Sequence, residues 1–329
     1  MFSTNKQIAS MVIGGLVIFT GCVTTDVPSK DEIMSALEAI ISGDEALGMD
    51  EFNDGGALDI EFGDITDGAL GKTLEDYYPS DSLRFRFGRN VTNHEISVTH
   101  EFEGDSVVYS TISHTVSGDF ITVIFDTSGV LVDSFAKTFN IEAIRKVKFK
   151  RIDNTRQPRR NWRLFALTPL VSSAGSKIDI DSLVITNTQN GDLLYRFEAD
   201  NLLDLYIDRE NIPQFTTGDS ITLKLYVSNT GPEYEWKSGE GAHLRIGRGR
   251  RSLNGHLHAR RIFFDDGTHG DADANDNEFT RRFFVHPPGM GFRHRIFKMF
   301  VDVIDFETLF STEGEYNAAL WGFPYKSKR

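Results

Sequence analysis

The chain has 329 residues, with 48 acidic and 35 basic side chains and a formal net charge of −13. Sixteen acidic but only two basic residues lie between Asp26 and Asp81, so this segment alone carries a charge of about −14. Phosphate backbones require a basic footprint, and this acidic balance argues against nucleic acid as a partner. The length predicts about two domains of roughly 100–200 residues each.

The N-terminus has the pattern of an export signal. Residues 1–7 are polar and include one positive side chain, Lys6, and residues 8–19 are apolar or small. Small residues then precede Cys22, as at a cleavage site. The apolar stretch is shorter than the ~20 residues that a spanning helix needs. We therefore expect residues 1–21 to be a cleaved leader rather than an uncleaved anchor or a buried helix.

The segment Phe19-Thr20-Gly21-Cys22 resembles the bacterial lipobox, with Phe19 in place of the usual Leu. The resemblance implies a diacylglyceryl thioether on Cys22 and an acylated N-terminus of the palmitate type. The lipid bilayer would then be a partner, and several acyl chains would give firm attachment. Residues 22–30 would form a tether. In such lipoproteins, Asp at the position of Thr24 signals retention in the inner membrane. Because Thr stands there instead, we expect the protein to lie in the cell envelope, with the outer membrane favoured, and either face of that membrane remains open. Cys22 is the only cysteine, which excludes disulfides within the folded part.

A helix is predicted after the tether. Ser29 is its expected N-cap, Asp31 and Glu32 lie in its first turn, and Gly43 ends it. Apolar residues between 33 and 41 recur at helical spacing. A second short helix is predicted over residues 44–52, followed by a loop over residues 53–82.

From Leu83 the pattern changes to alternation. Ile96, Val98, His100 and Phe102 alternate with polar residues, which predicts a strand with one buried face. The further predicted strands are 107–115, 120–126, 130–139, 144–152 and 162–169. Their short turn signals indicate an antiparallel sheet and, with the preceding helix, an α+β layout.

This order of elements resembles the NTF2-like (cystatin-like) cone fold over residues 31–173. The resemblance rests on residues 104–108 between strands, on the turn at 116–120, and on the closing segment 161–164. It implies a curved sheet around helices and often a pocket, which some members use as enzymes with an Asp–His pair. No residue here matches such a pair. A lipocalin-like or unrelated α+β sheet is the alternative.

A second domain is predicted after a linker at Ser172–Ser176, a run of small and polar residues. Residues 221–228 alternate most clearly, and the other predicted strands are 178–185, 193–197, 205–207, 243–246, 256–264, 279–286 and 293–304. This number of short strands indicates an immunoglobulin-like β-sandwich over residues 177–329. Residues 302–325 are predicted as a C-terminal capping extension. The fold class is therefore α+β followed by all-β.

An acidic loop between two of these strands is a candidate metal site. The loop 265–278 carries no Lys or Arg, and its six carboxylates are those of Asp265, Asp266, Asp271, Asp273, Asp276 and Glu278. Such crowding raises some pKa values unless a cation screens the charges, and Ca²⁺ accepts many oxygen ligands in flexible geometry. The loop is not an EF-hand, since Asp276 and Arg282 occupy the places of the required Gly and Glu. It resembles an acidic loop of bacterial immunoglobulin-like modules, which implies structural Ca²⁺. The alternative is a hairpin whose acids pair with nearby arginines.

No catalytic motif is present, so a non-catalytic function is expected. The first hypothesis is a membrane-anchored binding or scaffold lipoprotein with an envelope protein or glycan as partner. The second is a hydrolase or isomerase-like enzyme with a pocket in the α+β domain. The third is a calcium-dependent glycan-binding protein. A pocket holding a histidine or carboxylate with a shifted pKa would favour the second hypothesis.

Overall fold

The structure is a computed structural model, and it describes residues 28–49, 52, 60–62, 83–232, 239–248, 261–289 and 294–329. The predicted leader, Cys22 and the predicted tether up to residue 27 lie outside the described residues. Most of the loop predicted over residues 53–82 also lies outside them, as does most of the strand predicted over residues 256–264.

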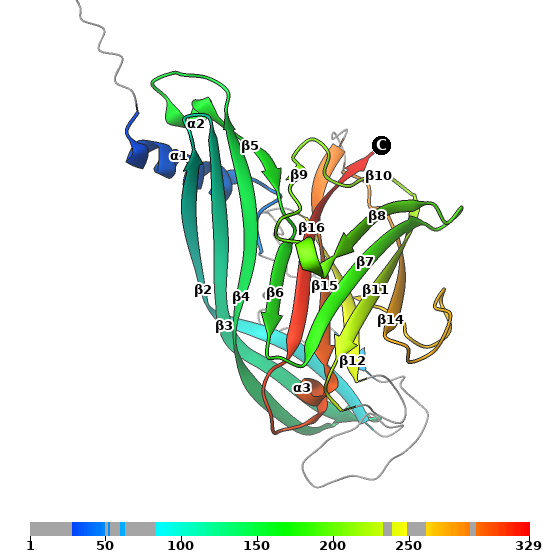
Figure 1. The fold of residues 1–329 in the computed structure, drawn as a ribbon. Helices are drawn as coiled ribbons and strands as arrows, with labels where there is room; N and C mark the ends of the chain where they lie inside the picture. The colour runs from blue at the N-terminus through cyan, green and yellow to red at the C-terminus, as the bar shows by residue number, and fades with distance from the viewer. Residues whose placement is uncertain are drawn as a thin grey trace, which may run out of the picture.

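The described strands form two sheets, one of twelve strands and one of four, almost all antiparallel (Figure 1). The elements of the first part are α1 (Lys30–Gly43), β1 (Ile60–Phe62), β2 (Leu83–Glu103), β3 (Val107–Asp126), β4 (Leu131–Arg151), α2 (Pro158–Asn161), β5 (Trp162–Leu167) and β6 (Leu170–Ala174). Those of the second part are β7 (Ile178–Asn187), β8 (Leu193–Glu198), η2 (Ala199–Asn201), β9 (Ile207–Asp208), β10 (Gln214–Thr216), β11 (Ser220–Asn229), β12 (Glu240–Arg248), β13 (Arg261–Ile262), β14 (Glu278–Phe284), β15 (His294–Asp305), α3 (Phe306–Phe310) and β16 (Ala318–Lys328).

Helix α1 begins and ends where the sequence predicts. The Ser29 hydroxyl accepts a hydrogen bond from the Glu32 N–H, and the Glu32 side chain accepts one from the Ser29 N–H. This capping box satisfies two N–H groups that the first turn leaves without partners. The helix buries Leu37 and Ile41 against the sheet. The second short helix, predicted over residues 44–52, is not found in residues 44–49, which contain a turn and a bend instead.

Strands β2, β3 and β4 are about twenty residues long, which is longer than the sequence predicts. The predicted break at Gly118 is instead a close approach of two strands. A side chain at Gly118 would place its Cβ 2.1 Å from the Asn90 carbonyl oxygen, next to a register shift between Val91 and Asn93. Glycine within a strand commonly marks such a bulge rather than a turn. The three long strands therefore bend without ending (Figure 1).

The predicted linker is partly strand. Ser172 and Ser173 lie in β6, which pairs with β4 on one side and with β16 on the other. Gly175 follows with φ +72° and makes the turn into β7. The twelve-stranded sheet therefore takes strands from both sides of this point, including β2–β6 before it and β12, β15 and β16 after it, whereas β7 belongs to the four-stranded sheet. The division of the chain into two domains stays a prediction.

The C-terminal segment is central rather than a capping extension. Strand β16 lies between β6 and β15, and β15 lies between β16 and β12. Phe297 and Val301 of β15 pack into the core shared with the four-stranded sheet, whereas Phe300 and Ile304 pack into the core toward β2–β4. Burial on both faces explains why β15 carries apolar residues at successive positions, as at residues 299–301. Such a run does not alternate, so the sequence pattern cannot show which side chains face which core.

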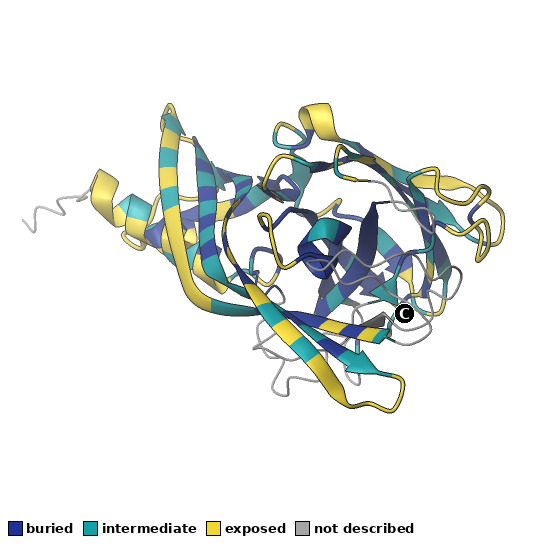
Figure 2. Ribbon diagram, turned by 90° about the horizontal axis from the view of Figure 1, so that it is seen from below, coloured by how far each residue is buried: buried dark blue, intermediate teal, exposed yellow. Residues whose placement is uncertain are grey.

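Three clusters of buried apolar side chains hold these layers together. The first lies between the sheet β14–β11–β7–β8 and strands β12, β15 and β16. The second lies between the lower halves of β2–β4 and the other face of β15, β16 and α3. The third lies between α1 and the upper halves of β3–β5. Seen from below, the large sheet curls around α3, with buried residues on its inner side (Figure 2).

A buried ion pair ties the first part of the sheet to the last. Arg89 of β2 donates to both Asp302 oxygens of β15, at 2.6 and 2.8 Å, and neither side chain is exposed. The Arg89 Nε–H also donates to the Tyr316 hydroxyl at 2.7 Å, and burial raises the pKa of Tyr316 to about 12. Breaking such a pair by removing one partner costs about 3–5 kcal/mol.

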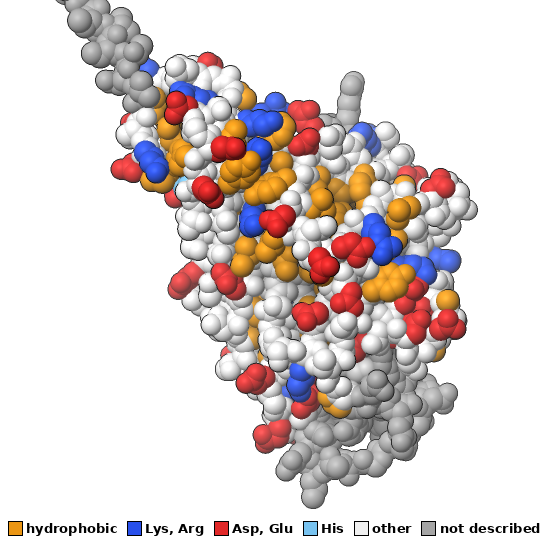
Figure 3. Space-filling view, in the orientation of Figure 1, with side chains coloured by type: hydrophobic (Ala, Val, Ile, Leu, Met, Phe, Trp, Pro, Cys, Tyr) orange, Lys and Arg blue, Asp and Glu red, His pale blue; other side chains and the backbone are white. Residues whose placement is uncertain are grey.

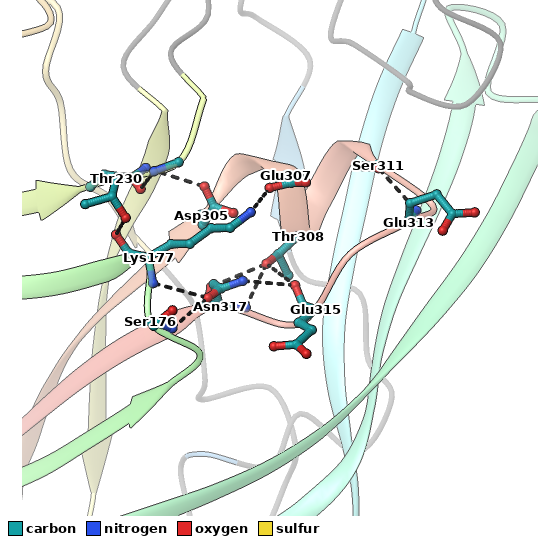
Figure 4. A network of polar contacts seen from close by, with 12 residues as sticks. Ser176, Lys177, Thr230, Asp305, Glu307, Thr308, Ser311, Glu313, Glu315 and Asn317 are labelled. Atoms are coloured by element: carbon teal, nitrogen blue, oxygen red, sulfur yellow. Dashed lines mark hydrogen bonds and ion pairs between the residues drawn. The ribbon is translucent and has the colours of Figure 1, made fainter.

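A second polar network surrounds α3 (Figure 4). The Asn317 side-chain oxygen accepts from the N–H of Ser176 at 3.1 Å, and Lys177 forms an ion pair with Glu307. The Thr308 hydroxyl accepts from the Asn317 N–H at 2.9 Å. These contacts fix the turn between β6 and β7 against α3 and β16.

Candidate functional site

The inner face of β2 and β3, beneath α1, carries polar side chains among apolar ones. Pairing places Ile96 opposite His114, Val98 opposite Ile112, and His100 opposite Ser110. Residues directly opposite each other share a face of the sheet, and the next pair along that face lies within reach of long side chains. His94 is therefore a diagonal neighbour of His114 on this inner face.

A cavity of about 350 Å³ lies between this face and α1 with the turn that follows it. Ligand pockets range from about 300 to 1,000 Å³. Its lining is mainly apolar, and the residues that line it are Glu38, Ile41, Ser42, Asp44, Leu47, Gly48, Met49, His94, Ile96, Val98, Ile112 and His114. Ile96 is 58% exposed although it lies on the inner face, so a large apolar surface is left uncovered at the mouth of the cavity.

Two histidines, His94 and His114, contribute polar ring nitrogens to the lining of this cavity. The His94 Nε2 and His114 Nδ1 atoms are 3.0 Å apart, and the two rings stack with centroids 5.2 Å apart. Burial lowers the pKa of His114 from 6.5 to about 4, with the charges of His94, Arg145 and Lys298 acting in the same direction. His114 is therefore a neutral imidazole at neutral pH, with one nitrogen that donates a hydrogen bond and one that accepts.

The same face continues into a second histidine contact beside the cavity. The His100 Nδ1 atom lies 2.7 Å from the Ser110 hydroxyl, and its Nε2 atom lies 3.9 Å from the Glu38 carboxylate of α1. Burial lowers the pKa of His100, although Glu38 opposes this shift. Glu38 of α1 therefore lies near His100 without a hydrogen bond to its Nε2 atom.

The turn after α1 is held in place by two arginines. Asp44 forms an ion pair with Arg209 at 3.2 Å and accepts a hydrogen bond from the Ala46 N–H. Arg145 of β4 donates to the carbonyl oxygens of Ala46 at 2.6 Å and Gly322 at 3.1 Å. Burial lowers the pKa of Arg145 to about 10. These bonds fix the backbone that forms one wall of the cavity.

The acidic loop 265–278 is a separate feature at the edge strand β14. Of its six predicted metal ligands, Asp265 and Asp271 are buried, and the other four are exposed or half-buried. Asp266 accepts from the Thr268 N–H and hydroxyl, and Glu278 forms an ion pair with Lys224. The six carboxylates therefore do not form one cluster, because Asp266 and Glu278 interact with Thr268 and Lys224 instead.

No three His, Cys, Asp or Glu side chains within the described ranges are arranged to hold a metal ion by themselves. No helix in the part of the chain that the structure describes is long and apolar enough to span a membrane.

Sequence reasoning misses the cavity histidines. The alternation through His100 is visible in the sequence, but the pairing register that brings His94 to His114 is not. The sequence does contain one signal for these histidines. His94, Ile96, Val98 and His100 alternate along one strand, so their side chains share a face of the sheet. The sequence does not show which strand lies opposite, because several registers satisfy the same alternation.

The chain has no matching family model and no matching curated protein. Among solved structures, it is similar to Extended-Synaptotagmin 2, in a chain that holds the SMP domain and two C2 domains, with 7% sequence identity and a TM-score of 0.15. The similarity covers 72% of this chain and 89% of that one. A TM-score this low carries no argument about fold or function.

Proposed function

We propose that this chain is a lipid-anchored protein of the bacterial cell envelope that binds a small, mostly apolar molecule between α1 and β2–β3. The observation that supports this proposal most strongly is the cavity, which combines exposed apolar surface with a pair of histidines. Apolar walls with a few placed polar groups are typical of small-molecule sites. A ligand with an apolar body and one hydrogen-bonding group would match this lining.

The position of the cavity relative to the lipobox supports an amphipathic ligand. Helix α1 starts eight residues after Cys22, and an extended tether of that length spans at most about 28 Å. If Cys22 is acylated, the cavity lies near the bilayer surface, where apolar molecules concentrate. Hydrophobic side chains are also present on the surface near α1 in Figure 3. We favour the outer membrane, on the ground of Thr24.

The two domain assignments belong to the same proposal. A helix packed on the concave face of a bent antiparallel sheet, with a cavity between them, supports an NTF2-like cone for residues 31–173. The four-stranded sheet packed on β12, β15 and β16 supports an immunoglobulin-like sandwich for the part that follows. In this account the sandwich is the scaffold and the cone holds the ligand.

An enzyme is the second candidate, because a shifted histidine pKa in a cavity is a recognised sign of a catalytic site. The size of the shift in the pKa of His114 argues against an enzyme. General bases work best when their pKa lies near the operating pH, and a value of about 4 makes His114 a poor proton acceptor at neutral pH. We therefore assign the histidines to hydrogen bonding with a ligand.

Binding is tested by titrating the full chain in detergent with the neutral fluorescent probe N-phenyl-1-naphthylamine. Ile96→Trp adds bulk at the cavity mouth, and we expect it to weaken probe binding at least about tenfold, a loss of about 1.4 kcal/mol. Leu131→Trp is the matched control, since Leu131 is also 58% exposed but lies in the β3–β4 hairpin, outside the cavity lining. Equal affinity of Ile96→Trp and the unmodified chain would remove the proposal.

A further inference from the structure

A buried positive charge beside the cavity has no carboxylate bound to it. Arg145 of β4 is 3% exposed, and its guanidinium donates to two uncharged groups, the carbonyl oxygens of Ala46 and Gly322. Its Nε–H has no acceptor, and no carboxylate in the described ranges forms an ion pair with it. Buried charges are normally paired, because burial removes them from water.

Arg145 lies on the same face of the sheet as the cavity. It is directly opposite Ile112 in the pairing of β4 with β3, and Ile112 lines the cavity. His114 is opposite Ala143, so Arg145 and His114 are diagonal neighbours on one face. The charge of Arg145 accordingly acts on His114, as does the charge of Lys298, which is 2% exposed.

The two acidic residues of the cavity lining do not cancel this positive charge. Asp44 acts on Arg145, but its carboxylate is already bound by Arg209 at 3.2 Å, so one carboxylate serves two guanidinium groups. Glu38 has a side chain that is 57% exposed, and water and salt screen its charge. An anion beside His114 would supply the negative charge that this part of the cavity lacks.

The histidine pair can supply hydrogen bonds to such an anion. The contact between His94 Nε2 and His114 Nδ1 uses one nitrogen of each ring. In the neutral pair, one of the two remaining nitrogens is a donor and the other is an acceptor. Uptake of one proton makes both of them donors, which suits the two oxygens of a carboxylate.

We infer that the cavity takes an amphiphile of the fatty-acid class, with an ionised carboxylate as its head. The head lies at His94 and His114, close to Arg145, and the acyl chain runs along Ile96 and Val98 of the lining. This inference rests on the proposed binding function, and it narrows the ligand from any mostly apolar molecule to one chemical class.

Dodecanoate labelled with ¹³C at its carboxyl group tests the inference on the unmodified full chain in detergent. Its NMR spectrum is recorded over a range of pH, with the same detergent lacking protein as the reference. We expect a protein-dependent carboxyl resonance that titrates at a lower pH than the resonance in detergent alone, because nearby positive charge favours the ionised carboxylate.

Two results overturn the inference. One is the absence of a protein-dependent carboxyl resonance, and the other is a bound carboxyl that titrates at the same pH as in detergent or at a higher pH. If the chain still binds N-phenyl-1-naphthylamine, either result leaves the proposed function standing. A chain that binds neither probe contradicts both proposals.

A variant pair tests the part played by the buried arginine. Arg145→Gln removes the charge, and we expect it to weaken dodecanoate at least about tenfold more than it weakens dodecanol, the uncharged ligand with the same chain. Both affinities are measured by displacement of N-phenyl-1-naphthylamine. Comparing ratios between chains in one detergent cancels the partitioning of the ligands into micelles.

Arg163→Gln is the matched control, because Arg163 is an exposed arginine of β5 outside the cavity lining. It should keep the ratio of the unmodified chain. The same ratio in Arg145→Gln would overturn the assignment of the carboxylate to this part of the cavity. The NMR measurement uses the unmodified chain, so it decides the question even if Arg145→Gln does not fold.

Discussion

At the scale of single residues, His114 links the fold to pH. Its pKa is about 4 in the folded chain and about 6.5 when exposed. Between these values the unfolded chain takes up a proton that the folded chain does not, so the free energy of unfolding falls as the pH is lowered from about 6.5 to about 4. At 1.36 kcal/mol per pKa unit, the contribution is roughly 3 kcal/mol.

Urea unfolding at several pH values between 7 and 4 measures this contribution. His114→Gln keeps a side chain that can hydrogen-bond to His94 but does not titrate, so its stability should fall less steeply with falling pH. We therefore expect the variant to gain stability relative to the unmodified chain as the pH falls, with most of the gain reached near pH 4. Parallel curves for the two chains would show that His114 titrates as it does in the unfolded state.

At the scale of elements, the bend in the long strands depends on Gly118. Its missing side chain allows β2 and β3 to approach, since a Cβ there would lie 2.1 Å from a backbone oxygen. Gly118→Ala should lower the free energy of unfolding by about 1–3 kcal/mol, the usual cost of overpacking. In Gly43→Ala the new Cβ meets nothing closer than 3.7 Å, and a helix position favours Ala, so this control should be neutral or stabilising.

Equilibrium unfolding in urea gives both values. If Gly118→Ala and Gly43→Ala have the same stability, the strands do not need the close approach at the bulge. The origin of the bend would then have to lie elsewhere in β2 and β3.

Some helices and strands can be predicted from the sequence and others cannot. Helix α1 is predictable with its cap, because the signals around Ser29 and Gly43 are local. The alternation in β11 is also predictable, since one of its faces packs in a core. The place of β16 between β6 and β15 is not, because it depends on pairing with residues about 150 positions earlier in the chain. The cavity histidines escape prediction for a similar reason, since their contact depends on the register between two strands.

At the scale of the whole molecule, the proposed location depends on the lipobox. Cys22→Ser removes the sulfur that would carry the glyceride, so we expect this variant to keep its leader or to lose membrane association in the bacterial host. Intact-mass measurement of the unmodified chain should show a leaderless protein with acyl chains attached, since the thioether is stable to purification. An unmodified thiol, or a retained leader, would contradict the envelope anchor.

The anchor and the cavity together give the molecule its proposed arrangement. Strands β2–β4 carry α1 at one end and reach the α3 region at the other (Figure 1), so the cavity lies at the end of these strands that carries α1. The four-stranded sheet and the buried Arg89–Asp302 pair stabilise the large sheet as a whole.

The most direct measurement is a crystal structure of the full chain grown with N-phenyl-1-naphthylamine. We expect electron density for the probe between α1 and β2–β3, in contact with Ile96 and with its amine within hydrogen-bonding distance of His94 or His114. Density for the probe only elsewhere, or α1 packed onto the sheet with the cavity closed, would contradict it.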